Sequence, residues 1–172
     1  MATSKILVRN DAAAITWKNS GGSFALTLTS VASASAREGG KADLTAVHAA
    51  RYAMRFTWKM TTAPTAGTVI ELWWTSSLSA TAGTGNTGVS VTGADAAWAP
   101  SGTVAEVKKM LQFIVAAPDA GSTCSLARVA EFVFFPPTRY GAPIVVNLTN
   151  QALAAAGADC FIEMVPLEDE AQ

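Results

Sequence analysis

The sequence predicts an all-β protein, folded as an antiparallel sandwich or barrel. Short segments alternate large apolar with small polar residues, which is the period-two pattern of half-buried strands. Clusters of Pro, Gly and Asp separate these segments, as expected for turns. Half of the residues are apolar and only 15% are charged, so the chain has few residues suited to the solvated face of a helix.

Nine segments have strand-like patterns. In 51–60 the large apolar residues occupy the even positions and the basic residues the odd positions, which predicts one buried face and one face toward water or a partner. A similar alternation covers 24–31. The other predicted strands are 68–74, 110–115, 126–135, 144–148 and 160–165, with weaker patterns at 6–8 and 14–17.

Short connections suggest how some of these segments are joined. The turn residues of 63–67 lie between two predicted strands, so we expect strands 51–60 and 68–74 to be antiparallel neighbours. Ala and Leu favour a helical turn at 150–156, and a second short helix is expected at 103–110.

The chain is predicted to be one domain with two extensions. Its 172 residues suffice for a single domain with a sizeable core. We expect an N-terminal arm at 1–20, a sandwich at 21–166 and an acidic C-terminal tail at 167–172. The longest irregular segment, 76–102, consists mainly of Gly, Ser, Thr and Ala and is expected to lie over one end of the sandwich or against a neighbour.

The charges are unevenly distributed along the chain. Residues 1–59 contain eight basic and three acidic residues, and nothing after Arg139 is basic. The net charge of −1 gives no bias toward nucleic acid, and we expect no nucleic-acid partner. No segment has the apolar core of a signal peptide or the ~20 apolar residues of a membrane span, so we expect synthesis in the cytoplasm and no membrane contact.

Residues that carry catalysis or bind metals are scarce. His48 is the single histidine and has no evident triad partners. Cys124 and Cys160 can pair, but neither lies in a nucleophile motif, and one His with two Cys cannot complete a zinc site without a carboxylate. Glu71 and Glu131, the acids within the strong strands, are a conceivable but unsupported glycosidase pair. We therefore expect no enzyme activity, no catalytic residue, no cofactor and no metal.

The adjacent residues Trp73 and Trp74 point to a covered or shared surface. Neighbours on a strand face opposite sides, so at most one of the two belongs to the core. The other must be exposed, covered at an edge, or in an interface, where aromatic residues are enriched. An exposed Trp can also stack on sugar rings.

Several segments together carry a resemblance to a known class of protein. They are a short N-terminal arm, the strand pattern 24–31, Ala49–Tyr52, Pro64–Trp74, the loop 79–86, Pro136–Gly141 followed by Ile144–Asn147, and the acidic end. In this order they resemble small virion structural proteins of tailed bacteriophages, of the type that decorates or cements the capsid. The resemblance implies a jelly-roll-like sandwich on the outer capsid surface of the virion, bound to several subunits of the major capsid protein and self-associated as a dimer or trimer.

This interpretation assigns protein contacts to the arm, the Trp residues and the Pro-rich turn. Arg139 is suited to a forked contact with a carboxylate of a neighbour, although Arg139 and Tyr140 can equally form a self-contained turn. A carbohydrate- or receptor-binding module of a fibre or spike, with a glycan ligand, and a head–tail junction component remain open alternatives. The candidate contact residues are Ile6, Leu7, Val8, Arg9, Trp73, Trp74, Trp98, Arg139 and Tyr140.

Overall fold

The computed structural model describes residues 6–9, 14–44, 50–99, 110–116 and 128–171. Within them the secondary-structure elements are all β-strands, which confirms the all-β prediction. In chain order they are β1 (Ile6–Arg9), β2 (Ile15–Lys18), β3 (Phe24–Ala25), β4 (Ser35–Glu38), β5 (Ala42–Asp43), β6 (Arg51–Trp58), β7 (Val69–Ser77), β8 (Ala96–Trp98), β9 (Leu111–Ala116), β10 (Arg128–Phe134), β11 (Tyr140–Asn147) and β12 (Phe161–Ala171).

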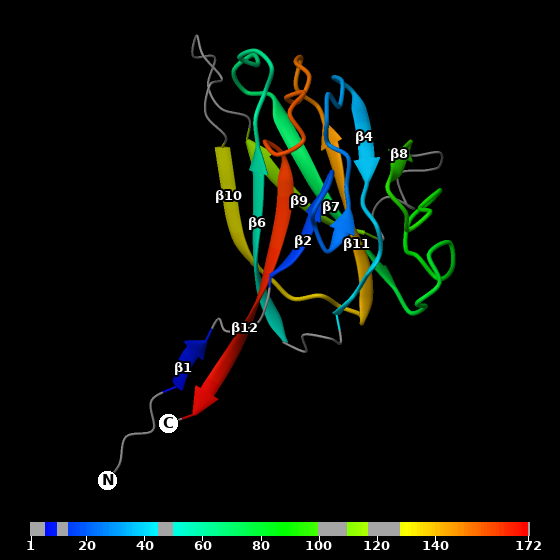
Figure 1. The fold of residues 1–172 in the computed structure, drawn as a ribbon, viewed down its shortest axis with the longest axis vertical. Helices are drawn as coiled ribbons and strands as arrows, with labels where there is room; N and C mark the ends of the chain where they lie inside the picture. The colour runs from blue at the N-terminus through cyan, green and yellow to red at the C-terminus, as the bar shows by residue number, and fades with distance from the viewer. Residues whose placement is uncertain (1–5, 10–13, 45–49, 100–109, 117–127, 172) are drawn as a thin grey trace.

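The strands form two sheets that pack face to face as a sandwich (Figure 1). In sheet 1 the strand order is β10-β6-β12-β2-β3, and β1 also pairs with β12. In sheet 2 the order is β8-β4-β11-β7-β9, and β5 also pairs with β11. These pairs are antiparallel except for β2 with β3, which are parallel.

The pairing of the eight main strands is that of a jelly roll. When the peripheral strands β1, β3, β5 and β8 are left aside, the first strand pairs with the last, β2 with β12, and the second with the seventh, β4 with β11. The third pairs with the sixth, β6 with β10, and the fourth with the fifth, β7 with β9. A long antiparallel ribbon rolled into two sheets gives this pattern, so the jelly-roll-like sandwich is confirmed.

One predicted pairing is wrong. Strands β6 and β7 are consecutive but belong to different sheets, so they are not hydrogen-bonded neighbours. The link between them crosses from one sheet to the other, and Met60 within it is buried and bridges Leu153. About ten residues easily span the ~10 Å between packed sheets. Turn residues alone therefore do not distinguish a hairpin from a crossing between sheets.

The alternation at 24–31 reflects burial more than sheet pairing. Only Phe24–Ala25 forms a strand, β3, yet Leu26 and Leu28 are fully buried in the core. The same period-two pattern therefore arises in an irregular segment whose alternate side chains point inward.

The helix predicted at 150–156 does not form. The N–H of Leu153 donates to the carbonyl oxygen of Val31, across the end of the sandwich, so it is not available for a helical bond. Most of the other predicted helix, 103–109, lies outside the described residues.

Both predicted extensions contain residues that belong to strands. Trp17 in β2 is fully buried, so the sandwich includes Ile15–Lys18, a segment that falls within the range expected for the arm. The acidic residues after Leu167 continue β12 as far as Ala171. The tail is thus the end of a long strand.

The main core fills the space between the inner faces of the two sheets. The even positions of 51–60 are all buried in it, as predicted from the alternation. A second, smaller cluster lies apart from the main core, and its members are Trp73, Val91, Trp98, Met110 and Ile144.

Candidate functional site

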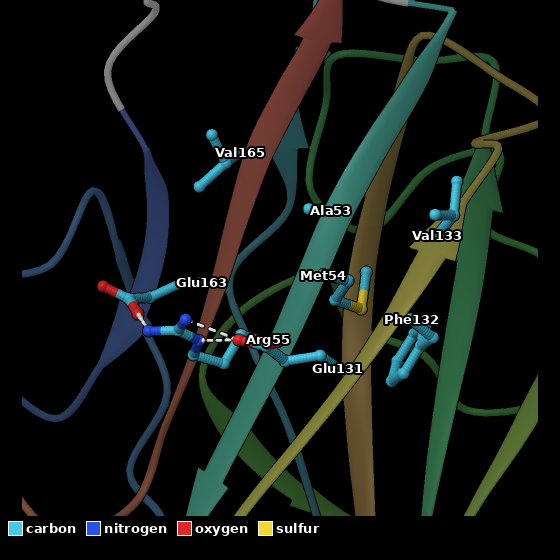
Figure 2. Close-up of a pocket in the computed structure, with 8 residues that line it drawn as sticks. All are labelled: Ala53, Met54, Arg55, Glu131, Phe132, Val133, Glu163 and Val165. Carbon is cyan, nitrogen blue, oxygen red and sulfur yellow. Dashed lines mark hydrogen bonds and ion pairs between the residues drawn. The ribbon is translucent and has the colours of Figure 1, made fainter. Parts of the chain in front are cut away.

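The outer face of sheet 1 is the first part of the candidate site. Strands β10, β6 and β12 lie side by side there, and the face is hollowed into a depression of about 640 Å³ (Figure 2). The lining residues come from these three strands and are Ala53, Met54, Arg55, Glu131, Phe132, Val133, Glu163 and Val165.

The strand register arranges this face in two rows. Arg55 in β6 lies opposite Glu131 in β10 on one side and Glu163 in β12 on the other. Residues directly opposite one another share a face, so the charged row runs across three strands. The neighbouring row is apolar and consists of Val133, Ala53 and Val165.

Arg55 holds both carboxylates of the charged row. Its Nε donates to Oε1 of Glu131 at 2.5 Å, and its Nη1 lies 4.0 Å from Oε2 of Glu163 (Figure 2). The side chains of Arg55 and Glu131 are more than half exposed, and exposed ion pairs contribute little to stability. The row is therefore better suited to orienting a partner than to holding the fold together.

The second part of the site is a ribbon made from both ends of the described chain. Strand β1 pairs with the end of β12, from Ile6 opposite Ala171 to Arg9 opposite Glu168. The ribbon projects from one end of the sandwich (Figure 1). This pairing cannot be read from the sequence, because no local pattern links residues at opposite ends of a chain. The ribbon contains four predicted contact residues, namely Ile6, Leu7, Val8 and Arg9.

The predicted Trp contacts are buried. Trp74 belongs to the main core, and Trp73 packs with Trp98 in the second cluster, against Val91 of the long loop. One Trp of the adjacent pair was expected to be exposed, covered at an edge, or in an interface, and Trp73 takes the covered position. No Trp side chain of the chain is more than 8% exposed. Trp73, Trp74 and Trp98 thus offer no free contact surface, and the glycan-binding alternative loses the exposed Trp on which it depended.

Lys41 fixes the long loop to the body. Three carbonyl oxygens of the loop segment 79–84 converge on its ammonium, whereas a phosphate cradle needs converging N–H groups. The loop is recognisable from its composition, whereas this anchor has no local signal in the sequence. Four oxygen atoms lie 2.7–3.1 Å from the Lys41 Nζ and share its three N–H donors, namely the Oγ of Ser77 and the carbonyl oxygens of Ser79, Thr81 and Thr84.

Two carboxyl groups hold the later part of the same loop. Glu38 is completely buried and accepts hydrogen bonds from the backbone N–H and the hydroxyl of Thr92. Burial raises the pKa of Glu38, and the bonds from Thr92 only partly oppose it. Burial also acts to raise the pKa of Asp95, but the hydrogen bonds from Arg37 and Thr27 outweigh it and the pKa lies below its ordinary value.

Replacing Glu38 by glutamine is expected to change how stability depends on pH. Because the folded-state pKa of Glu38 is raised, its contribution is fully present below the unfolded-state pKa and is lost as the pH rises through the folded-state pKa. Glutamine keeps an acceptor for Thr92 and does not ionise. The melting temperature of the Glu38→Gln variant minus that of wild type should therefore increase as the pH rises from about 4 to about 8.

The Asp95→Asn variant is the matched control, because the sign is opposite. The lowered pKa of Asp95 gives a contribution that is present above its unfolded-state pKa and is lost as the pH falls through its folded-state pKa. Relative to wild type, Asp95→Asn should lose melting temperature as the pH rises toward about 4 and should then show no further change up to about pH 8. Thermal unfolding at a series of pH values checks both, and parallel curves for the two variants would contradict the assignment.

Arg139 and Tyr140 form a turn within their own chain. Arg139 donates from Nε and Nη2 to the two carboxylate oxygens of Asp43 at 3.0 and 2.8 Å, and its guanidinium lies over the Tyr140 ring. The hydrogen bonds from Arg139 to Asp43 raise the pKa of the guanidinium. The fork that was expected to reach a carboxylate of a neighbour is thus occupied by Asp43 of β5 in the same chain.

The side chains with reactive or metal-binding groups do not converge within the described residues. His48 and Cys124 lie outside them. Cys160 is a buried free thiol, and burial raises its pKa, which is the opposite of activation. Glu71 and Glu131 belong to different sheets. Across the described ranges no group of three or more potential metal ligands occurs, and no helix there has the length and apolarity needed to cross a membrane.

Comparisons with protein-family models, curated proteins and solved structures gave no match. The candidate site is therefore defined by its own geometry. It combines an outer sheet face with one charged and one apolar row, and a ribbon that extends beyond the sandwich.

Proposed function

We propose that this chain is a non-enzymatic structural protein of a tailed-bacteriophage virion. It decorates the outer surface of the capsid and stabilises the shell by bridging neighbouring major capsid subunits. The observation that supports this proposal most is the ribbon of β1 and the end of β12, which leaves a jelly-roll body (Figure 1). The resemblance of Pro64–Trp74 and Pro136–Gly141 to phage decoration proteins suggests the kind of particle.

The ribbon is the part of the chain that gains most from a partner. A two-stranded ribbon is marginally stable in water unless a further strand or a packing surface supports it. A capsid subunit that adds a strand to the ribbon supplies main-chain hydrogen bonds along its length. Attachment and ordering of the ribbon are then the same event.

The long loop and Arg139 are already engaged within the body, so attachment is assigned to the ribbon. The long loop is anchored by Lys41 and covers Trp73, and Arg139 is engaged by Asp43. A rigid body with one projecting ribbon suits a protein that sits at a junction between subunits. Many copies on one shell turn modest single contacts into durable attachment through multivalency.

Removal of residues 1–10 is expected to weaken capsid binding strongly while the jelly roll still folds. The probe is a shell assembled from the major capsid protein encoded by the same phage. The intact chain should co-sediment with the shell to a saturating occupancy and raise its disassembly temperature. The truncated chain should need at least about tenfold more protein for half occupancy, since the loss of one strand-addition contact exceeds about 1.4 kcal/mol.

Two comparisons make this experiment decisive. The Leu78→Ser variant changes a highly exposed apolar residue of the long loop and should bind like the intact chain. The melting temperature of the truncated chain should stay close to that of the intact chain, because its core is unchanged. Equal occupancy of the intact and truncated chains would remove the ribbon from the mechanism, and absence of binding by the intact chain would overturn the proposal.

A further inference from the structure

Strand β10 forms an edge of sheet 1 with an apolar outer side. Within the described part of the chain it is hydrogen-bonded on one side, to β6. Its inner positions are held by the core, since Phe132 stacks on Phe113 of β9 with ring centroids 4.6 Å apart. Along its outer side the exposed fractions are 52% for Val129, 54% for Val133 and 63% for Phe135, which follows the strand.

Between Val129 and Phe134, the part of β10 whose side chains are described, the edge has little of the usual protection against pairing. Natural edge strands carry free charges, prolines or bulges that prevent another strand from adding. The one charge among the described side chains of β10 is Glu131, and its carboxylate is occupied by Arg55 of the same sheet at 2.5 Å. Pro136 and Pro137 come only after Phe135, where they end the edge without interrupting it. The described part of this edge is therefore largely apolar and suited to pairing with a further strand.

A second copy of β10 pairs with this edge more favourably in one register than in the others. Two copies related by a two-fold axis pair antiparallel, with one residue opposite its own equivalent. If that residue is Glu131, two carboxylates face each other, which is unfavourable. If it is Phe132, Glu131 lies opposite Val133, Val129 lies opposite Phe135, and the two Phe132 rings become cross-strand neighbours.

We propose that two copies of this chain associate through antiparallel pairing of their β10 strands, with Phe132 at the two-fold axis. The pairing joins the two copies of sheet 1 into one continuous sheet and brings the exposed apolar residues of the two outer faces side by side as cross-strand neighbours. It does not depend on the proposed attachment to a capsid, because the ribbon of β1 and β12 takes no part in it.

The dimer should be weak in dilute solution. One pair of strands buries less than the ~800 Å² per partner of a standard stable interface, so we expect a dissociation constant of about 10 µM or higher. Sedimentation velocity of the full chain up to about 500 µM should resolve a reversible monomer–dimer equilibrium. A single monomeric species over that range would overturn the proposal.

A charged substitution in β10 tests whether the dimer uses this surface. The Val133→Lys variant adds a solvated charge to the edge and should raise the dissociation constant at least about tenfold. The Leu78→Lys variant makes the same kind of change at a highly exposed site outside sheet 1 and should dimerise like wild type. Equal dimerisation of the Val133→Lys variant, with an unchanged near-ultraviolet spectrum, would show that another surface is used.

Cysteine crosslinking tests the register. In the proposed register residue 131 of one copy lies opposite residue 133 of the other, so a mixture of Glu131→Cys and Val133→Cys chains should form a disulfide-linked heterodimer. Each variant alone should crosslink no more than wild type, which carries Cys124 and Cys160 and serves as the control. Efficient crosslinking of the Glu131→Cys chain with itself would contradict the proposed axis.

Discussion

Replacing Gly141 by alanine is expected to destabilise the protein by about 3–5 kcal/mol and to lower its melting temperature by roughly 10 °C. A Cβ atom at this position would lie 2.5 Å from both Cε2 and Nε1 of Trp74 and would also overlap Cζ2. The indole ring cannot move aside, because it lies between Trp17 and Phe134, with ring centroids 5.7 and 4.9 Å away. Overpacking of this kind is resisted by a close-packed core.

The register explains why the ring meets this glycine. Trp74 in β7 lies opposite Pro143 in β11, and Gly141 is the diagonal neighbour on the same face. A side chain as large as indole fits diagonally across the strand pair only where the neighbour has no side chain. The sequence segments Pro64–Trp74 and Pro136–Gly141, which carried the resemblance to phage proteins, thus meet in the core.

Two further variants separate this contact from a general effect of alanine. Gly83→Ala is the matched control, since a Cβ there meets nothing within 4 Å, and its change in stability should stay within about 0.5 kcal/mol. In a Trp74→Phe background, the smaller ring lacks Nε1 and Cζ2, so Gly141→Ala should cost at least about 1 kcal/mol less. Chemical denaturation measures wild type, the three single variants and the double variant, and an equal cost of Gly141→Ala in both backgrounds would refute the clash.

The strands were predictable from sequence where both faces of a strand have distinct environments. Residues 51–60 show this most clearly, because the main core takes the even positions while Arg55 and its neighbours face outward. Strand β4 was missed because its buried end is Glu38, a carboxylate where the alternation rule expects an apolar residue. A buried acid held by Thr92 carries no sign of its burial in the sequence.

The candidate site was predictable only in part, for a related reason. Strand 51–60 placed Arg55 on a face toward water or a partner, and its face is the one that carries the depression. Its partners Glu131 and Glu163 come from strands far along the chain, and the register that aligns them is set by the jelly-roll pairing. Likewise, Trp73 looked available until the long loop covered it. Local patterns indicate faces, whereas long-range pairing decides what lies on them.

Replacing Asn147 by aspartate is expected to cost about 3–5 kcal/mol at neutral pH. This fully buried amide ends β11 and closes one end of the sandwich. Its Oδ1 accepts from the N–H and hydroxyl of Thr149 at 3.1 and 2.7 Å. An oxygen in place of Nδ2 would meet three carbonyl oxygens instead of donating to them. The carbonyl acceptors of Nδ2 are Val31 at 3.0 Å, Ala32 at 3.3 Å and Gln151 at 2.8 Å.

The pH dependence of the Asn147→Asp variant distinguishes lost donation from a general packing defect. Burial beside carbonyl oxygens raises the pKa of the introduced carboxyl group in the folded state, so its protonated form, which can donate again, is favoured at low pH. The deficit relative to wild type should therefore grow as the pH rises through that folded-state pKa. Asn150→Asp is the matched control, because Asn150 is exposed and its Oδ1 accepts from the N–H of Thr65 at 2.8 Å, a role that a carboxylate also fills. Thermal unfolding from about pH 4 to pH 8 should give a widening gap for the first variant and a nearly constant one for the second. A constant gap for Asn147→Asp would mean that shape, and not the three donated hydrogen bonds, makes this position essential.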